Sequence, residues 1–459
     1  MNSPNLIVIV LDSVRRDHLS CYGYARSTTP HIDRLAEESV LFLEAYSTSC
    51  WTIPSHASLF TGLYPSHHGV NDLQADFRPD QLTLAGYLAD RGYRTAAISC
   101  NGFISNHANL GRDFQLSVDV SALRGAARGM VPRIVRAVHS IWRERTARDR
   151  GAARATRLAL KWLGEQETAR PFFLFMNLMD CHAPYRLRRP DRHRFLEGEA
   201  GARADDVSQD PFAVMAGEQA LSEQELSDLE ALYDGSLHYL DRHVGVLVEH
   251  LERLNLADST ALILTSDHGE SFGEHGLMDH QYGLFEHLIA IPLILRLPAR
   301  ELGGEIRSNP VQLTDVLPTI ASWVDGGSDQ RIEDLDGQPL LHTPPREAVL
   351  AEYLVPNLRA IRRRFPAADV RKLDVALRSI RVGSQKLILA SDGERQLYDL
   401  RADPSEKGDL ASVNPEAADA LEERLISALG DWPRRRRDVD PDSDDLQEVR
   451  DRLQALGYL

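Results

Sequence analysis

The chain has 459 residues, of which 43% are hydrophobic and 26% are charged. This balance is that of a globular protein and excludes disordered, collagen-like and coiled-coil chains. Lysine and arginine total 52 whereas aspartate and glutamate total 68, so the formal net charge is −16. The negative charge argues against a nucleic-acid partner and against binding to anionic membranes. The four cysteines are too few for a disulfide scaffold, and we interpret them as reduced thiols.

The N-terminal residues lack the basic region and the long apolar segment of a secretory signal. Apolar runs elsewhere are shorter than the ~18 residues that a membrane-spanning helix needs. We therefore expect a cytoplasmic protein with no stable membrane insertion.

The first 300 residues alternate between short apolar runs and stretches of helical periodicity. The runs at 6–11, 95–99, 172–178 and 261–265 predict buried strands, and the stretches at 32–40, 82–91 and 226–254 predict helices. This alternation predicts an α/β fold with a large, mostly parallel sheet sandwiched by helices. Residues 118–160 are interpreted as a helical insertion, and residues 186–222 as a long loop or lid.

The sequence changes character near residue 345. Short runs at 379–382, 386–389 and 396–398 predict antiparallel strands, and the stretches at 415–429 and 444–456 predict helices. We therefore expect a large domain at 1–345 and a small antiparallel sheet-plus-helix domain at 346–459.

Two acidic segments directly follow predicted strands. Asp12 follows the first strand, and a buried carboxylate there requires a partner or a cation, unless it caps a helix. Asp267 and His268 follow the strand at 261–265, with His275 and His280 within the next turns. Carboxylate oxygen plus imidazole suits a divalent ion. The alternative is a capped helix start with incidental histidines. In a parallel sheet such strand ends are where ligands bind.

Two further segments carry reactive side chains. Pro54 fits the first turn of a helix, which places Thr52 at the helix N-terminus. The backbone N–H groups there favour an anion, and a hydroxyl can either cap the helix or attack an anionic ester. His182, after the strand at 172–178, can donate a proton or contact an anion, or it can be a hydrogen-bonded turn histidine. Together these segments supply the groups that metal-assisted ester chemistry needs.

The arrangement resembles the sulfatase family of the alkaline-phosphatase superfamily. The segments that carry the resemblance are 11–15, 21–24, 29–33, 54–62, 265–270, 273–276, 313–319, 397–400 and 403–404. The resemblance implies an alkaline-phosphatase-like fold and a small anionic ester as substrate. It also implies one divalent metal ion (Mn, Zn, Ca or Mg). The implied metal ligands are Asp12, Thr52, Asp267 and His268. The implied catalytic residues are Thr52, His182 and His280, and the implied substrate contacts are His56, Asn101 and His275.

Several positions depart from the family pattern. Thr52 stands where sulfatases carry the Cys or Ser that is oxidised to formylglycine, and His56 replaces an arginine. Ser13 replaces a second aspartate, and Asn101 lies where a lysine-containing segment is expected. Oxidation of threonine gives a ketone, so no formylglycine is expected. In having threonine at this position, the sequence resembles the phosphoglycerol and phosphoethanolamine transferases of the superfamily.

The resemblance therefore favours a metal-dependent hydrolase that cleaves a phosphate or sulfate ester through a covalent Thr52 intermediate. Three alternatives stay open. They are a sulfuric ester hydrolase that works without formylglycine, a transferase that passes a phospho or sulfo group to an alcohol, and a catalytically silent binding protein. The last is motivated by the missing basic residues, and the presence of Asp12, Asp267 and His268 argues against it.

Overall fold

The computed structural model describes residues 3–71, 74–104, 110–122, 149–166, 170–196, 198, 200–342 and 344–432. Two predictions fall outside these ranges: most of the helical insertion at 118–160, and the helix at 444–456.

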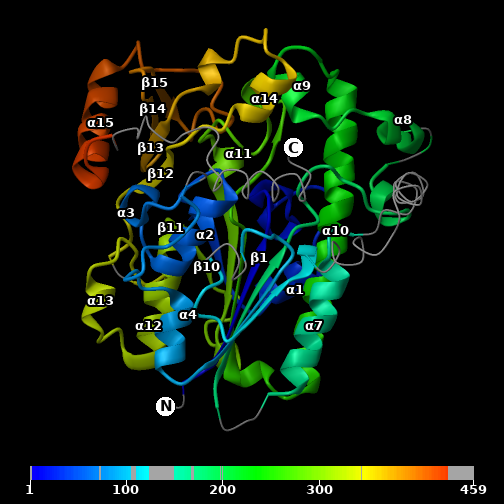
Figure 1. The fold of residues 1–459 in the computed structure, drawn as a ribbon, viewed down its shortest axis with the longest axis vertical. Helices are drawn as coiled ribbons and strands as arrows, with labels where there is room; N and C mark the ends of the chain where they lie inside the picture. Colours follow the sequence, from blue (N-terminus) through cyan, green and yellow to red (C-terminus); the bar gives the residue numbers. More distant parts are fainter. Residues whose placement is uncertain are drawn as a thin grey trace.

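A nine-stranded sheet forms the centre of the protein (Figure 1). Its strand order is β10-β2-β9-β6-β1-β5-β3-β4, and β11 also pairs with β2. β9 runs antiparallel to its neighbours β2 and β6, whereas the other pairings are parallel. The strands are β1 Asn5–Leu11, β2 Val40–Tyr46, β3 Arg94–Ser99, β4 Leu116–Asp119, β5 Phe172–Leu178, β6 Thr260–Thr265, β9 Ala290–Arg296, β10 Ile306–Arg307 and β11 Val311–Gln312. The predicted mostly parallel sheet is confirmed.

The four predicted strands are β1, β3, β5 and β6, each within one residue of the expected bounds. Their near-continuous apolar sequence follows from burial on both faces, and every residue of β5 and β6 is buried. The predicted helix at 32–40 is too long. Helix α1 ends at Glu37, and Val40 already begins β2, because the apolar run that follows pairs with β9.

Helices cover both faces of the sheet (Figure 1). α1 Pro30–Glu37, α7 Ala152–Gly164 and α10 Glu223–Arg253 pack on one face, where Ile7, Ile9 and Leu11 of β1 point. α2 Thr52–Thr61, α4 Leu84–Asp90 and α12 Val316–Asp325 pack on the other face, which receives Leu6, Val8 and Val10. The alternation along β1 places apolar side chains in both cores.

A second, antiparallel sheet follows in the C-terminal part of the chain. Its order is β12-β13-β14-β15, and α15 packs on it through Leu421 and Leu425. The elements are β12 Val349–Tyr353, β13 Leu377–Val382, β14 Gln385–Ala390, β15 Arg395–Asp399 and α15 Pro415–Leu429. The predicted strands and the helix at 415–429 are confirmed, whereas β12 is not predicted from the sequence. The expected boundary at 345 lies just before β12.

Short elements complete the fold. They are α3 Pro65–His68, η4 Asp191–His193, α8 Ala200–Asp206, α9 Pro211–Met215, β7 Ser271–Phe272, β8 Met278–Asp279, α11 Glu286–Ile289, α13 Gln330–Glu333 and α14 Arg359–Arg364. The predicted loop at 186–222 thus contains three short helical segments. Among the described residues, no helix has the length and apolar character needed to cross a membrane.

Candidate active site

The carboxyl ends of the central strands bring three predicted ligands together. Asp12 follows β1, and Asp267 and His268 follow β6, the parallel neighbour of β1. One ligand atom from each of the three residues lies within 4.8 Å of the others, and all three residues are buried. The juxtaposition that the sequence predicts for these residues is present.

The backbone around these ligands is held in a tight arrangement. Ser13 adopts a left-handed conformation (φ 61°), and its N–H donates to Asp267 Oδ1 at 3.2 Å. Tyr233 of α10 stabilises the same turn, because its hydroxyl donates a hydrogen bond to the Ser13 carbonyl at 2.9 Å. After His268 the chain needs glycine, since a Cβ on Gly269 would lie 1.9 Å from the His287 carbonyl oxygen. The hydrogen bond between Ser13 and Asp267 connects the ends of β1 and β6.

Thr52 lies at the first position of α2, and its side chain reaches this cluster. The Thr52 hydroxyl is 3.1 Å from His268 Nε2, and the residue is 1% exposed. His268 donates its Nδ1 hydrogen to the Gly269 carbonyl at 2.9 Å. Because a neutral imidazole carries one N–H, Nε2 presents its lone pair toward Thr52.

The cluster carries uncompensated negative charge. Burial and the Asp12 charge raise the pKa of Asp267 well above its usual range. Burial also acts to raise the pKa of Asp12, but the neighbouring His182 and His268 rings outweigh it and lower that pKa. Asp267 Oδ2 is buried and has no hydrogen-bond partner among the described residues. Two carboxylates, an imidazole and a hydroxyl are a donor set that fits a divalent cation.

Two amides orient Asp12. Asn101, which follows β3, donates from Nδ2 to Asp12 Oδ2 at 3.1 Å and accepts from the Phe103 N–H at 3.1 Å. Both polar ends of Asn101 thus engage protein atoms, which makes it a positioning residue for Asp12 instead of the expected substrate contact. Asn177 in β5 donates to the same oxygen at 3.3 Å. Asn177 is not among the residues predicted from the sequence, although an amide within a buried apolar strand is a readable signal.

His56 also faces protein atoms, and not the expected substrate. Its Nδ1 donates to the Thr52 carbonyl at 2.9 Å, one turn earlier in α2. Its Nε2 lies 3.5 Å from Asn177 Nδ2. Burial lowers the pKa of His56 to about 4, so the ring is neutral at pH 7. His56 therefore supports the start of α2 and the position of Thr52.

A second cluster borders the first. His182, Asp279 and His280 are buried, and one ligand atom from each lies within 4.8 Å of the others. The His280 ring stacks on His268 with ring centroids 4.3 Å apart, and it also stacks on Trp51 at 4.9 Å. Burial and the neighbouring His280 lower the pKa of His182 to about 4, so the protonated form that a general acid requires is scarce at pH 7.

The structure does not bring His275 to either cluster. Its ring is exposed and stacks on Phe285, with centroids 3.6 Å apart and an interplanar angle of 2°. The expected substrate contact is therefore not seen. His275 lies only five residues before His280 in the sequence. However, it has a left-handed backbone (φ 53°) in the short turn between β7 and β8, whereas His280 follows β8.

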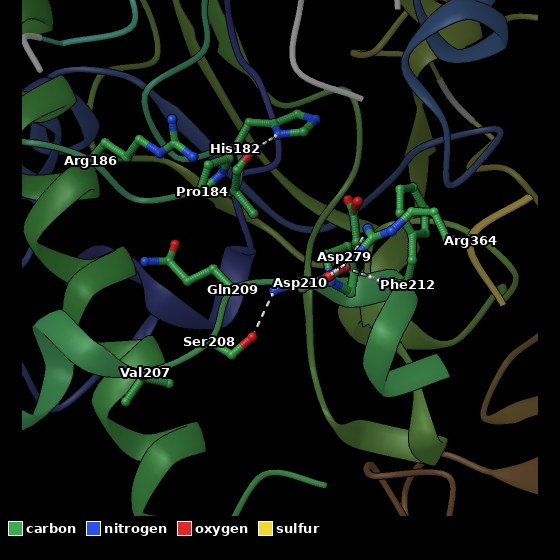
Figure 2. Close-up of a pocket in the computed structure, with 12 residues that line it drawn as sticks. His182, Pro184, Arg186, Val207, Ser208, Gln209, Asp210, Phe212, Asp279 and Arg364 are labelled. Carbon is green, nitrogen blue, oxygen red and sulfur yellow. Dashed lines mark hydrogen bonds and ion pairs between the residues drawn. The ribbon is translucent and has the colours of Figure 1, made fainter. Parts of the chain in front are cut away.

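A cavity of about 380 Å³ lies beside the second cluster, and His182 and Asp279 form part of its wall (Figure 2). The segment at 207–212 lines it, so the predicted lid segment contributes to the cavity. Arg186 and Arg364 also line it, and Arg364 donates to Asp210 at 3.0 Å. The cavity offers a substrate both basic and acidic groups.

Known proteins resemble the chain over most of its length. The sulfatase family profile matches residues 4–326. The chain is 25% identical to an N-acetylgalactosamine-6-O-sulfatase of Bacteroides thetaiotaomicron, with 92% of this chain and 93% of that protein covered. It is 26% identical to a choline-sulfatase of Rhizobium meliloti, with 90% and 83% covered.

A solved structure has the same fold. The phosphonate monoester hydrolase of Agrobacterium radiobacter superimposes with a TM-score of 0.71 at 21% identity, and 93% of this chain and 95% of that chain are covered. The resemblance noted in the sequence is confirmed by the family match over residues 4–326. The chain belongs to the sulfatase family and is a sulfatase-like ester hydrolase.

Proposed function

We propose that the protein hydrolyses a phosphate ester and uses Thr52 as its nucleophile, with a divalent cation held by Asp12, Thr52, Asp267 and His268. The observation that carries this proposal is the buried Thr52 hydroxyl, 3.1 Å from His268 Nε2 at the start of α2. The donor set supports the cation, as does Asp267 Oδ2, which is buried and accepts no hydrogen bond among the described residues. When bound, the cation supplies charge that lowers the hydroxyl pKa of Thr52 and offsets the charge of the ester.

The protein side chains account for the geometry of the reaction. The Thr52 hydroxyl loses its proton to solvent and its oxygen attacks phosphorus. The new O–P bond forms as the bond to the leaving oxygen breaks, the leaving oxygen takes up a proton from solvent and departs as the alcohol, and Thr52 carries the phosphoryl group. Water then cleaves that ester and releases phosphate. Asn101 and Asn177 hold Asp12, and the N-terminal N–H groups of α2 favour the anionic group. The cavity beside His182 accommodates the rest of the substrate.

Phosphorus is favoured over sulfur because of the nucleophile. A formylglycine hydrate releases sulfate by eliminating it from a geminal diol, and threonine offers no such route. A Thr52 sulfate ester would need a second displacement. The sulfate ester is kept as a second candidate because the curated relatives named above are sulfatases.

The Thr52→Ala variant tests the proposal. We expect the activity of the metal-loaded protein to fall by about 10⁴-fold or more, since removal of a nucleophile leaves only binding and electrostatic contributions. Thr61→Ala, at the far end of α2, is the matched control and keeps activity. Assays with an aryl phosphate, a phosphate diester, a phosphonate ester and an aryl sulfate identify the ester class. Activity retained in Thr52→Ala contradicts the nucleophile assignment.

Mass spectrometry adds a direct measurement. Brief exposure to a phosphate ester followed by acid quenching is expected to add a phosphoryl group to the peptide that contains Thr52. Added alcohol acceptors distinguish hydrolysis from transfer, because a transferase forms a new ester at the expense of free phosphate.

A further inference from the structure

We propose that His182, Asp279 and His280 bind a second divalent cation beside the one assigned to Asp12, Asp267 and His268. This inference rests on the proposed function, because it assigns a further metal site to the same reaction centre. It also replaces the catalytic role that the family resemblance implies for the two histidines.

The first argument is the donor geometry. His182 follows β5, whereas Asp279 ends β8 and His280 follows it. The three residues place one ligand atom each within 4.8 Å of the others. Two imidazoles and a carboxylate are a common ligand set for divalent transition metals such as zinc. His182 donates Nδ1–H to the Ala183 carbonyl at 2.6 Å, which leaves the lone pair on Nε2. A metal-ligating histidine typically donates its other nitrogen to a carbonyl in this way.

The burial and the hydrogen bonding of His280 also favour a cation at this place. The ring is completely buried, and its Nε2 atom has no hydrogen-bond partner among the residues that the structure describes. A buried polar nitrogen without a partner is costly in a folded protein. Stacking on His268 and on Trp51 holds the ring in one orientation. A cation would satisfy this nitrogen at the point where the ring is already positioned.

The buried carboxylates around the two clusters also favour a second cation. Four buried carboxylates gather at this end of the sheet and its adjoining loops, and within the described part of the chain none of them forms an ion pair with an arginine or a lysine; they are Asp12, Asp267, Glu270 and Asp279. Buried charges need partners or cations. A second cation would offset the charge of Asp279, which no arginine or lysine neutralises within the described part of the chain.

A cation in the second site would face the cavity through the same residues that line it, His182 and Asp279 (Figure 2). There it supplies positive charge to the leaving-group oxygen of the ester, which removes the need for a protonated histidine. Two adjacent cations on either side of a transferring phosphoryl group are an established arrangement for in-line displacement.

The test counts metal ions. The full chain is stripped with a chelator, reloaded with excess Zn²⁺ and desalted, and zinc per chain is measured by mass spectrometry. We expect two zinc ions in the wild type, one in His280→Gln and one in Asp279→Asn. His342→Gln, an exposed histidine, is the control and keeps two. Circular dichroism checks the fold of each variant, and a chelator titration of the wild type resolves the two zinc affinities without any substitution.

The outcomes separate the two proposals. A wild type that holds one zinc ion and hydrolyses esters overturns the second site alone. The second site is also overturned if His280→Gln and Asp279→Asn each still hold two zinc ions. A wild type that holds two ions, one of which is lost in each site variant, but hydrolyses no phosphate or sulfate ester supports the second site and contradicts the proposed function. A wild type that holds no zinc overturns the second site, whereas the proposed function is decided by the Thr52→Ala assay.

Discussion

Acidification is expected to destabilise the protein through His68, a buried imidazole that packs against α2. The Val70 N–H donates to His68 Nδ1 at 3.0 Å, and His68 Nε2 lies 3.2 Å from Ser58 Oγ. Since Nδ1 accepts a hydrogen bond, a second ring proton would point at another donor. Burial lowers the pKa of His68 from 6.5 to about 3. The ring is thus neutral in the folded protein.

The sign and size of the effect follow from this shift. The unfolded chain protonates His68 near pH 6.5 whereas the folded chain does so near pH 3, so the unfolded state binds more protons between these values. Stability is therefore lost as the pH falls through this window. At about pH 5, the loss is about 2 kcal/mol, because each pH unit below 6.5 contributes about 1.36 kcal/mol. At about pH 7.5 the loss is close to zero.

Urea unfolding of the wild type and of His68→Gln at these two pH values measures the effect. Glutamine does not titrate, so the stability advantage of the wild type over the variant should shrink by about 2 kcal/mol on acidification. The exposed His342→Gln variant should track the wild type at both pH values. An unchanged difference between wild type and His68→Gln would refute the reasoning.

Two further substitutions probe the site and the contact between β14 and α11. Asn101→Ala removes a hydrogen bond to Asp12 and should weaken the affinity for a divalent metal by about 10- to 100-fold without unfolding the protein. Chelator competition measures this affinity, and an unchanged value would show that Asn101 does not position Asp12. Lys386→Met removes the buried cation of β14 that contacts Glu286 at 3.0 Å and Glu406 at 2.8 Å, and should cost about 3–5 kcal/mol in urea unfolding. A loss below about 1 kcal/mol would contradict this reading, because exposed pairs contribute that little.

Much of the central fold could be predicted because its signals are local. Strands buried on both faces have continuous apolar sequences, and β1, β3, β5 and β6 were recognisable from these alone. Strand β12 was not recognisable, although all five of its residues are buried, because its apolar run is short and is interrupted by Glu352. Helix α1 was predicted too long because the periodicity of its last turn merges with the first residues of β2.

The metal ligands were also predictable, for a topological reason. Asp12 and the pair Asp267 and His268 directly follow strands, and parallel strands present their carboxyl ends at one edge. Asp279 and Trp51 were not identified as part of the site. Their roles depend on how the chain after His268 folds back to stack His280 on the start of α2.

The sequence by itself determined the central strands, the reactive residue types and their order along the chain, because apolar periodicity and strand-end position are properties of neighbouring residues. Only the tertiary structure decided which polar atoms face one another. It directs Asn101 to Asp12, 89 positions away, and His56 to the Thr52 carbonyl, while it leaves His275 exposed on Phe285. These choices depend on hydrogen bonds and stacking between distant segments, which no local pattern specifies.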